Sequence, residues 1–145
     1  MTRINLVEPH QLTSKHLMAE YRELPRIFSA VLKLQGQGKT PADVTIPDAY
    51  VLGTGHMKFF YNKILWLANR YIELNLELNT RSYRLDRNLF DSVIFSIAAL
   101  DDAWYGKPYT PAPEDIYLNM IRLCKRSNLP PVLEELFVPL WKTND

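Results

Sequence analysis

The stretch that decides the fold class is "HMKFFYNKILWLANRYIELNLELN", residues 56–79. Apolar residues recur through it at helical spacing and form a wide apolar face made of Phe59, Phe60, Leu65, Trp66 and Ile72. Thr54 precedes the stretch and is a suitable N-cap residue. We therefore predict one helix over about 56–79, central to the hydrophobic core, with the aromatic cluster 59–61 packed inside it.

A second long helix is predicted over residues 13–34, "TSKHLMAEYRELPRIFSAVLKL". Thr13 or Ser14 is its N-cap, and the glycines of "GQGK" (36–39) are a stop signal. Two prolines follow within residues 40–53, which predict an ordered connection across the surface.

Two more helical segments complete the pattern. Residues 88–105, "NLFDSVIFSIAALDDAWY", form the first, and a proline-rich loop (106–115) leads into the second, "EDIYLNMIRLCKR" (114–126). Apolar residues in the tail 127–145 predict that it packs against the rest. No internal repeat or alternating strand pattern occurs, so the predicted fold class is all-α: a compact single domain spanning the chain, with three or four main helices and long ordered loops.

Composition excludes several classes of protein. The 145 residues suffice for one domain with its own core, and 47% hydrophobic and 23% charged residues are ordinary for a globular protein. Cys124 is the only cysteine, and His10, His16 and His56 are scattered, so we predict chemistry without a metal or cofactor. No apolar run reaches the roughly 18 residues of a membrane span, and the polar start is not a signal peptide, so a cytoplasmic monomer is expected.

The helix over 13–34 carries its charges in one stripe. At about 100° per residue, Lys15, Arg22, Arg26 and Lys33 fall within roughly 40° of one another. The apolar residues cluster on the opposite side: Leu17, Tyr21, Leu24, Phe28, Val31 and Leu32. A solvated surface face is the ordinary interpretation of such a stripe. Because it contains no acid for i,i+4 pairing, it also fits an anionic ligand such as a phosphate backbone.

Glu23 and Pro25 interrupt this pattern. Glu23 projects about 60° from Arg26, at the edge of the stripe, where a surface salt bridge with Arg22, Arg26 or His16 is one interpretation. Pro25 removes a backbone hydrogen bond and clashes with the preceding turn, at a cost of about 3 kcal/mol in a helix interior. The sequence therefore predicts a helix kinked in the turn that holds its one flanking carboxylate.

Three separated blocks resemble one family. "MTRINL" (1–6), "HLMAEYRELPR" (16–26) and "VLGTGHMKFFYNK" (51–63) are similar, in order and spacing, to the phage-type pyrimidine-dimer DNA glycosylases of the endonuclease V class. The resemblance is close from residue 1 to about 78, and it continues more weakly through "GKPYTP" and "IYLNMIRLCKR" (116–126). It ends at about residue 127, because the aromatic and basic tail of the family is absent. "WYGK" (104–107) looks similar but lies before the last helix, so we transfer no function to it.

The resemblance implies a chemistry. Such enzymes excise a base with the α-amine of residue 2, here Thr2 once Met1 is removed, and then cleave the strand as AP lyases. An α-amine suits this role because its reference pKa is about 7.7–8.0, against about 10.4 for lysine. Glu23 matches the family carboxylate that stabilises the cationic sugar and assists removal of a C2′ proton. His16 is a candidate to orient Glu23, and an ordinary surface histidine is the alternative.

The resemblance also implies a partner, double-stranded damaged DNA. Residues matched to phosphate or DNA contacts are Arg3, Arg22, Arg26, Arg122 and Arg126; Lys15 strengthens the basic stripe where the family has an uncharged residue, and Lys33 and Lys39 extend it. The expected lesion is the cyclobutane pyrimidine dimer. The same chemistry on another lesion, such as a ring-opened purine or an abasic site, stays open, as does a non-catalytic DNA-binding protein.

Two residues have competing interpretations. His56 follows "GTG" at a predicted helix start, where backbone amides bind phosphate in some proteins, but a tight structural turn is favoured over that role. Cys124 has no evident activating base, so a buried apolar role is favoured over a nucleophilic one.

Overall fold

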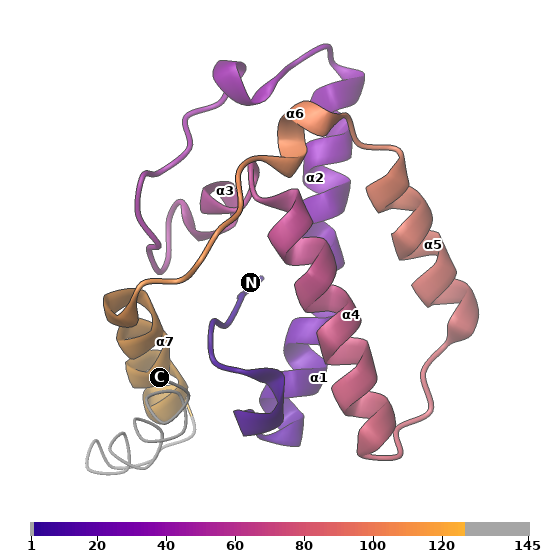
Figure 1. Ribbon diagram of the computed structural model, residues 1–145, viewed down its shortest axis with the longest axis vertical. Coiled ribbons are helices and arrows are strands. Elements are labelled where there is room, and N and C mark those ends of the chain that lie inside the picture. The colour runs from indigo at the N-terminus through magenta and orange to yellow at the C-terminus, as the bar shows by residue number, and fades with distance from the viewer. Residues whose placement is uncertain (1, 127–145) are drawn as a thin grey trace.

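The computed structural model describes residues 2–126, and its regular elements are all helices (Figure 1). They are η1 (Pro9–Gln11), α1 (Ser14–Glu23), α2 (Pro25–Gly36), η2 (Pro41–Asp43), α3 (His56–Phe59), α4 (Ile64–Thr80), α5 (Arg87–Ala98), α6 (Asp102–Tyr105) and α7 (Pro113–Arg126). The predicted all-α class is confirmed, and the two later helical segments appear as α5 with α6 and as α7. The predicted packing of the tail 127–145 lies outside the described residues.

The predicted helix over 13–34 is divided into α1 and α2 at Leu24, the residue before Pro25. Thr13 caps α1, as predicted, because its hydroxyl accepts a hydrogen bond from the His16 amide at 3.3 Å. The Leu24 amide still bonds the Glu20 carbonyl, whereas Pro25 has no amide to continue the ladder. Pro25 becomes the first residue of α2, the position at which proline costs a helix least. The division explains how a proline is accommodated beside Glu23.

The prediction of one continuous helix over 56–79 is wrong. The chain forms α3, leaves helical geometry at Lys63 (φ −130°, ψ 38°), and starts again as α4. The Lys63 ammonium donates to the Phe59 carbonyl at 2.8 Å and lies 3.9 Å from the Phe59 ring centroid, which stabilises the turn. Gly55, in the left-handed conformation at φ 91°, and not Thr54, precedes α3.

The break at Lys63 changes which residues of α4 are buried. Leu65 and Ile72, predicted on the apolar face, are 49% and 40% exposed. The fully buried positions of α4 are instead Ile64, Leu67, Tyr71, Leu74 and Leu78. A helix that restarts at residue 64 has a different angular phase from one that begins at residue 56, so the extrapolated face was rotated. The aromatic cluster 59–61 is buried, as predicted.

Tyr71 joins the helices at the centre of the core. Its ring stacks on Tyr21 of α1 at 4.9 Å between centroids and on Phe90 of α5 at 5.7 Å, and it meets the edge of Phe28 of α2 at 6.5 Å. α4 therefore packs against α1, and α2 packs against α5. In Figure 1 the N-terminal segment runs between α4 and α7, so the frame of helices encloses the start of the chain.

The "WYGK" segment (104–107) has a structural role. Trp104 is 1% exposed, and Gly106 has φ 72° and ψ −167°, a backbone conformation that is essentially restricted to glycine. A Cβ atom at Gly106 would overlap the Asn62 carbonyl. The buried tryptophan and the close backbone approach give Trp104 and Gly106 structural roles.

Gly106→Ala is therefore expected to lower the free energy of unfolding by on the order of 3 kcal/mol. Gly38→Ala is a matched control, because Gly38 also has positive φ (78°) but has open space around its Cβ position. The control should lose about 1 kcal/mol. Urea titrations of the two variants measure this difference, and equal losses would contradict the close approach at Gly106.

Candidate functional site

The first residues of the chain pass through the protein interior without regular secondary structure. Five of the six residues from 2 to 7 are buried: Thr2, Ile4, Asn5, Leu6 and Val7. Buried backbone groups need hydrogen-bond partners, and an extended segment outside a sheet must find them in side chains. This requirement determines which polar residues surround the segment.

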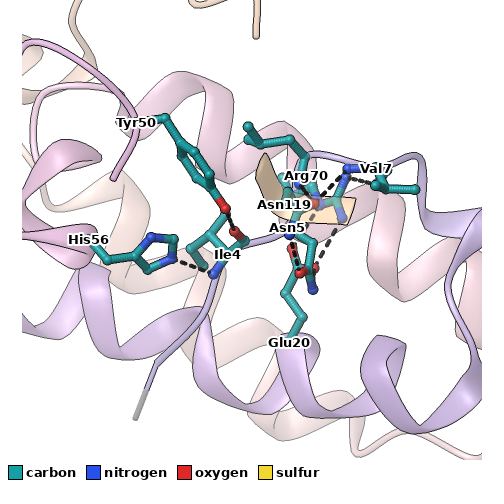
Figure 2. Close-up of polar contacts among 9 residues, drawn as sticks. Ile4, Asn5, Val7, Glu20, Tyr50, His56, Arg70 and Asn119 are labelled. Atoms are coloured by element: carbon teal, nitrogen blue, oxygen red, sulfur yellow. Dashed lines mark hydrogen bonds and ion pairs between the residues drawn. The ribbon is translucent and has the colours of Figure 1, made fainter. Parts of the chain in front are cut away.

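Side chains from distant elements meet the requirement (Figure 2). The Ile4 amide donates to His56 Nε2 at 2.8 Å, and the Tyr50 hydroxyl donates to the Ile4 carbonyl at 2.9 Å. Asn119 Oδ1, on α7, accepts from the Leu6 and Val7 amides at 2.7 and 3.2 Å. The position of the N-terminal segment is thus set by side chains that lie 46 to 113 residues away in the sequence.

A buried ion pair completes the network. Arg70 of α4 contacts Glu20 of α1 through two hydrogen bonds of 2.7 and 3.0 Å, and both side chains are at most 5% exposed. Arg70 also donates to the Val7 carbonyl at 2.7 Å, and Asn5 bridges Glu20 and Asn119 through two bonds of 2.8 Å. These additional hydrogen bonds satisfy polar atoms of the Arg70–Glu20 pair that the ion pair itself leaves open. Removing either partner would leave an uncompensated buried charge.

A pocket of about 190 Å³ opens beside this network. Its walls are Arg3, Asn5, Lys15, His16, Ala19, Glu20, Glu23, Arg122 and Leu123. Because Glu20 is neutralised by Arg70, the remaining charges are three cations, Arg3, Lys15 and Arg122, and the carboxylate of Glu23. Within the part of the chain that the structure describes, Glu23 makes no ion pair with Arg22 or Arg26. The part of the salt-bridge interpretation that pairs Glu23 with Arg22 or Arg26 is therefore not supported, and Glu23 lies in the pocket wall instead.

Two side chains in the pocket have lowered pKa values. Burial lowers the pKa of Arg122, opposed by attraction to Tyr50, Glu20 and Glu23, although an arginine stays charged. One terminal nitrogen of Arg122 is buried without a hydrogen-bond partner among the described residues. Burial, followed by the charges of Lys15 and Arg122, lowers the pKa of His16. His16 is therefore a neutral neighbour of Glu23 at pH 7.

The structure brings some of the predicted site residues together and separates others. Arg3, Lys15, His16, Glu23 and Arg122 share the pocket. Thr2 is buried directly before Arg3 but is not part of the pocket wall. Arg22 and Arg26 are exposed on α1 and α2, and Lys33 and Lys39 line a different pocket of about 490 Å³ together with Lys58. The side chain of Arg126 lies outside the described part of the structure.

His56 is neutral in this arrangement. Its Nδ1 lies 2.7 Å from the Val51 carbonyl, so Nδ1 carries the proton and Nε2 is the acceptor for Ile4. Burial, as the largest cause, lowers the pKa of His56 to about 4. The turn predicted at "GTGH" is confirmed, with Gly55 left-handed, and the histidine has a structural role in it.

This lowered pKa predicts a pH dependence of stability. The unfolded chain gains the His56 proton near pH 6.5 and the folded chain only near 4, so the stabilisation is complete above 6.5 and falls as pH drops from 6.5 to 4. The expected loss in this window is about 3 kcal/mol. Urea titrations at several pH values should show a flatter profile for His56→Gln than for the wild type. Parallel profiles would contradict the assignment.

A model of the pyrimidine dimer DNA glycosylase family matches residues 1–91. The match covers more than half of the chain and includes the N-terminal segment, α1, α2 and α4. The chain belongs to this family. A pyrimidine dimer DNA glycosylase acts on damaged DNA, and the pocket of this one combines a carboxylate with cations suited to phosphate. The family match ends before α7, so Arg122 and Asn119 lie outside the matched residues. Their places, Arg122 in the pocket wall and Asn119 against the N-terminal segment, come from the geometry alone.

By geometry, the described residues of this glycosylase contain neither a metal-ligand cluster nor a membrane-spanning helix. Over residues 2–126, no group of three or more His, Cys, Asp and Glu side chains is placed to hold a metal ion. No helix in the same part of the chain is long and apolar enough to cross a membrane.

Sequence reasoning missed the residues that hold the N-terminal segment of the glycosylase: Glu20, Tyr50, Arg70 and Asn119. One signal was available, since Arg70 is a charged residue on the face of α4 that also carries Leu67, Tyr71 and Leu74. A charged residue on a buried face requires a buried partner. Cys124 is buried, in agreement with its apolar interpretation.

Proposed function

We propose that this chain is a bifunctional enzyme, a pyrimidine-dimer N-glycosylase and AP lyase, that uses the Thr2 α-amine as nucleophile and Glu23 as its catalytic carboxylate. The observation that carries the proposal is the pocket in which Glu23 lies among Arg3, Lys15 and Arg122, next to the segment that begins at Thr2. Thr2 follows the initiator Met1 in the sequence, and removal of Met1 would make the Thr2 amine the start of the chain.

The first step forms a bond between the Thr2 nitrogen and deoxyribose C1′. The N-glycosidic bond breaks, the base leaves with the bonding electrons and takes up a proton, and ring opening of the sugar leaves an imine. The Glu23 carboxylate stabilises the cationic sugar as this charge develops. At this stage the glycosidic bond is broken and the strand remains intact, while the pyrimidine stays joined to its neighbour through the cyclobutane ring of the dimer.

The second step is β-elimination. Glu23, or a water molecule that it orients, removes a proton from C2′, and the electrons form the C2′–C3′ double bond as the C3′–oxygen bond breaks. The 3′ phosphate leaves, and hydrolysis of the imine releases the enzyme. Arg3, Lys15 and Arg122 hold the phosphates near the lesion, with Arg22, Arg26 and Lys33 on the surrounding surface. Arg126 is proposed as a further phosphate contact, on the family resemblance alone.

The proposal places the reaction on damaged double-stranded DNA in the cytoplasm. All proposed residues belong to one chain, so a monomer is sufficient. His16, neutral and in the same pocket, is proposed to orient Glu23.

Incision assays on three duplexes test this function. The duplexes carry a cyclobutane thymine dimer, a plain abasic site or a ring-opened purine, each at one position. We expect scission of a glycosidic bond and strand cleavage at the dimer, and strand cleavage at the abasic site. Faster cleavage at the ring-opened purine would assign a different lesion. Binding to all three without any incision would show a non-catalytic DNA-binding protein.

A further inference from the structure

The polar backbone of Ile4 is held from two sides by buried rings (Figure 2). His56 accepts from its amide at 2.8 Å and Tyr50 donates to its carbonyl at 2.9 Å. His56 is 2% exposed and Tyr50 3% exposed. These two bonds fix both the position and the rotation of the residue that lies two positions from Thr2.

The two rings are themselves fixed in the core. The His56 ring packs edge-to-face against Tyr50 and Phe60, with ring centroids 5.3 and 5.7 Å apart. Tyr50 packs in the same way against Phe59, with centroids 6.0 Å apart. The His56 Nδ1 proton bonds the Val51 carbonyl, which sets the ring orientation. Such side chains keep one rotamer, so the bonds to Ile4 have a defined direction.

Both side chains keep the protonation state that these bonds need. Burial lowers the pKa of His56 and raises the pKa of Tyr50. At neutral pH, Nε2 of His56 therefore remains an acceptor and the Tyr50 hydroxyl remains a donor.

Ile4 is close enough to Thr2 for this to affect the chemistry. Two residues of extended chain span at most about 7 Å, so a shift or rotation at Ile4 carries over to the α-amine of Thr2. A misplacement of about 1 Å can cost roughly a hundredfold in rate. We propose that His56 and Tyr50 are positioning residues for the reaction, which aim the Thr2 amine by holding the Ile4 peptide groups. This inference rests on the proposed function of Thr2.

A pair of conservative variants isolates the bond to Ile4. The side-chain amide of glutamine reaches the place of Nε2, so His56→Gln keeps an acceptor for the Ile4 amide and loses the bond to Val51. The shorter amide of asparagine reaches the place of Nδ1, so His56→Asn keeps the bond to Val51 and loses the one to Ile4. Tyr50→Phe removes only the hydroxyl and retains the packed ring.

The measured quantity is the single-turnover rate constant for borohydride-trapped adduct on abasic-site DNA. It is compared with the affinity for DNA that carries a tetrahydrofuran abasic analogue, which has no aldehyde and forms no imine. Circular dichroism melts give the folded fraction. Loss of folded protein lowers the amplitude of trapping, whereas misplacement of the amine lowers the rate constant.

We expect His56→Asn to be slower than His56→Gln by on the order of tenfold to a hundredfold, and Tyr50→Phe to be slowed several-fold. All three should bind the tetrahydrofuran duplex within about twofold of the wild type. Equal rate constants for the Gln and Asn variants, or losses confined to the amplitude, would overturn the positioning inference. Adduct formation by the wild type in the same experiment would still support the proposed function. A wild type that traps no adduct would overturn both.

Discussion

A chain with one extra residue before Thr2 will form no borohydride-stable adduct with abasic DNA. The Thr2 nitrogen would then be a non-nucleophilic amide, and the new α-amine would be displaced by up to about 3.5 Å. The Thr2 amine is lost as a nucleophile and the new amine is displaced from its position. Together these changes are expected to lower the rate of adduct trapping by about 10³-fold or more, on the order of the rate advantage that correct orientation gives a nucleophile. A cleavable amino-terminal fusion supplies both chains, one that starts at Thr2 and one that starts one residue earlier.

The control for this experiment is Lys15→Gln in the chain that starts at Thr2. Lys15 lines the same pocket as Glu23 and is the other primary amine there. If the α-amine is the nucleophile, the Lys15 variant still forms the adduct. Its DNA affinity should be weaker and should fall less steeply with salt, because one phosphate contact is lost. Normal trapping by the extended chain would contradict the role of Thr2.

Glu23→Gln should abolish incision and leave DNA binding intact. The substitution keeps the size of the side chain but removes both the negative charge beside the sugar and the proton acceptor. Loss of a general base costs roughly 10²–10⁴ in rate. Because Glu23 is the carboxylate among Arg3, Lys15 and Arg122, removing its charge does not weaken the attraction of the pocket for phosphate.

Single-turnover incision of dimer DNA and titration of the uncleavable tetrahydrofuran duplex measure the two effects separately. Glu8→Gln is the matched control, because Glu8 is an exposed carboxylate outside this pocket. A parallel loss of binding and incision in Glu23→Gln would indicate a structural role for the carboxylate. Unchanged incision would remove it from the mechanism.

The sequence was sufficient for those parts of the site that depend on local spacing. Lys15, His16 and Glu23 lie on one helix, and their gathering in the pocket follows from its period. The division at Pro25 follows from the chemistry of proline. The all-α class was also predictable, since helical periodicity is a local property of the chain.

The remaining features depend on contacts that no local pattern encodes. His56 and Ile4 are 52 residues apart, Arg70 and Glu20 are 50 apart, and Asn119 and Leu6 are 113 apart. The break at Lys63 has the same cause, because its ammonium bonds the Phe59 carbonyl and lies 5.7 Å from the ring centroid of Tyr109. Periodicity alone extended the helix through that point and rotated the predicted face of α4.

The hydrogen-bond network around residues 2–7 and the pocket beside it have different roles in this account. Core side chains hold the start of the chain in place, while the side chains that would contact DNA line the open pocket. The arrangement fits a nucleophile that belongs to the backbone, because a terminal amine has no side chain of its own to orient it.

Peptide mapping of the trapped adduct is the most direct test of the central claim. Wild-type protein is incubated with abasic-site DNA and borohydride, digested with nuclease and trypsin, and analysed by mass spectrometry. The account predicts that the sugar remnant is found on the α-nitrogen of the peptide Thr2–Arg3, with Met1 absent. A remnant on the side chain of Lys15 or of any other lysine would contradict it.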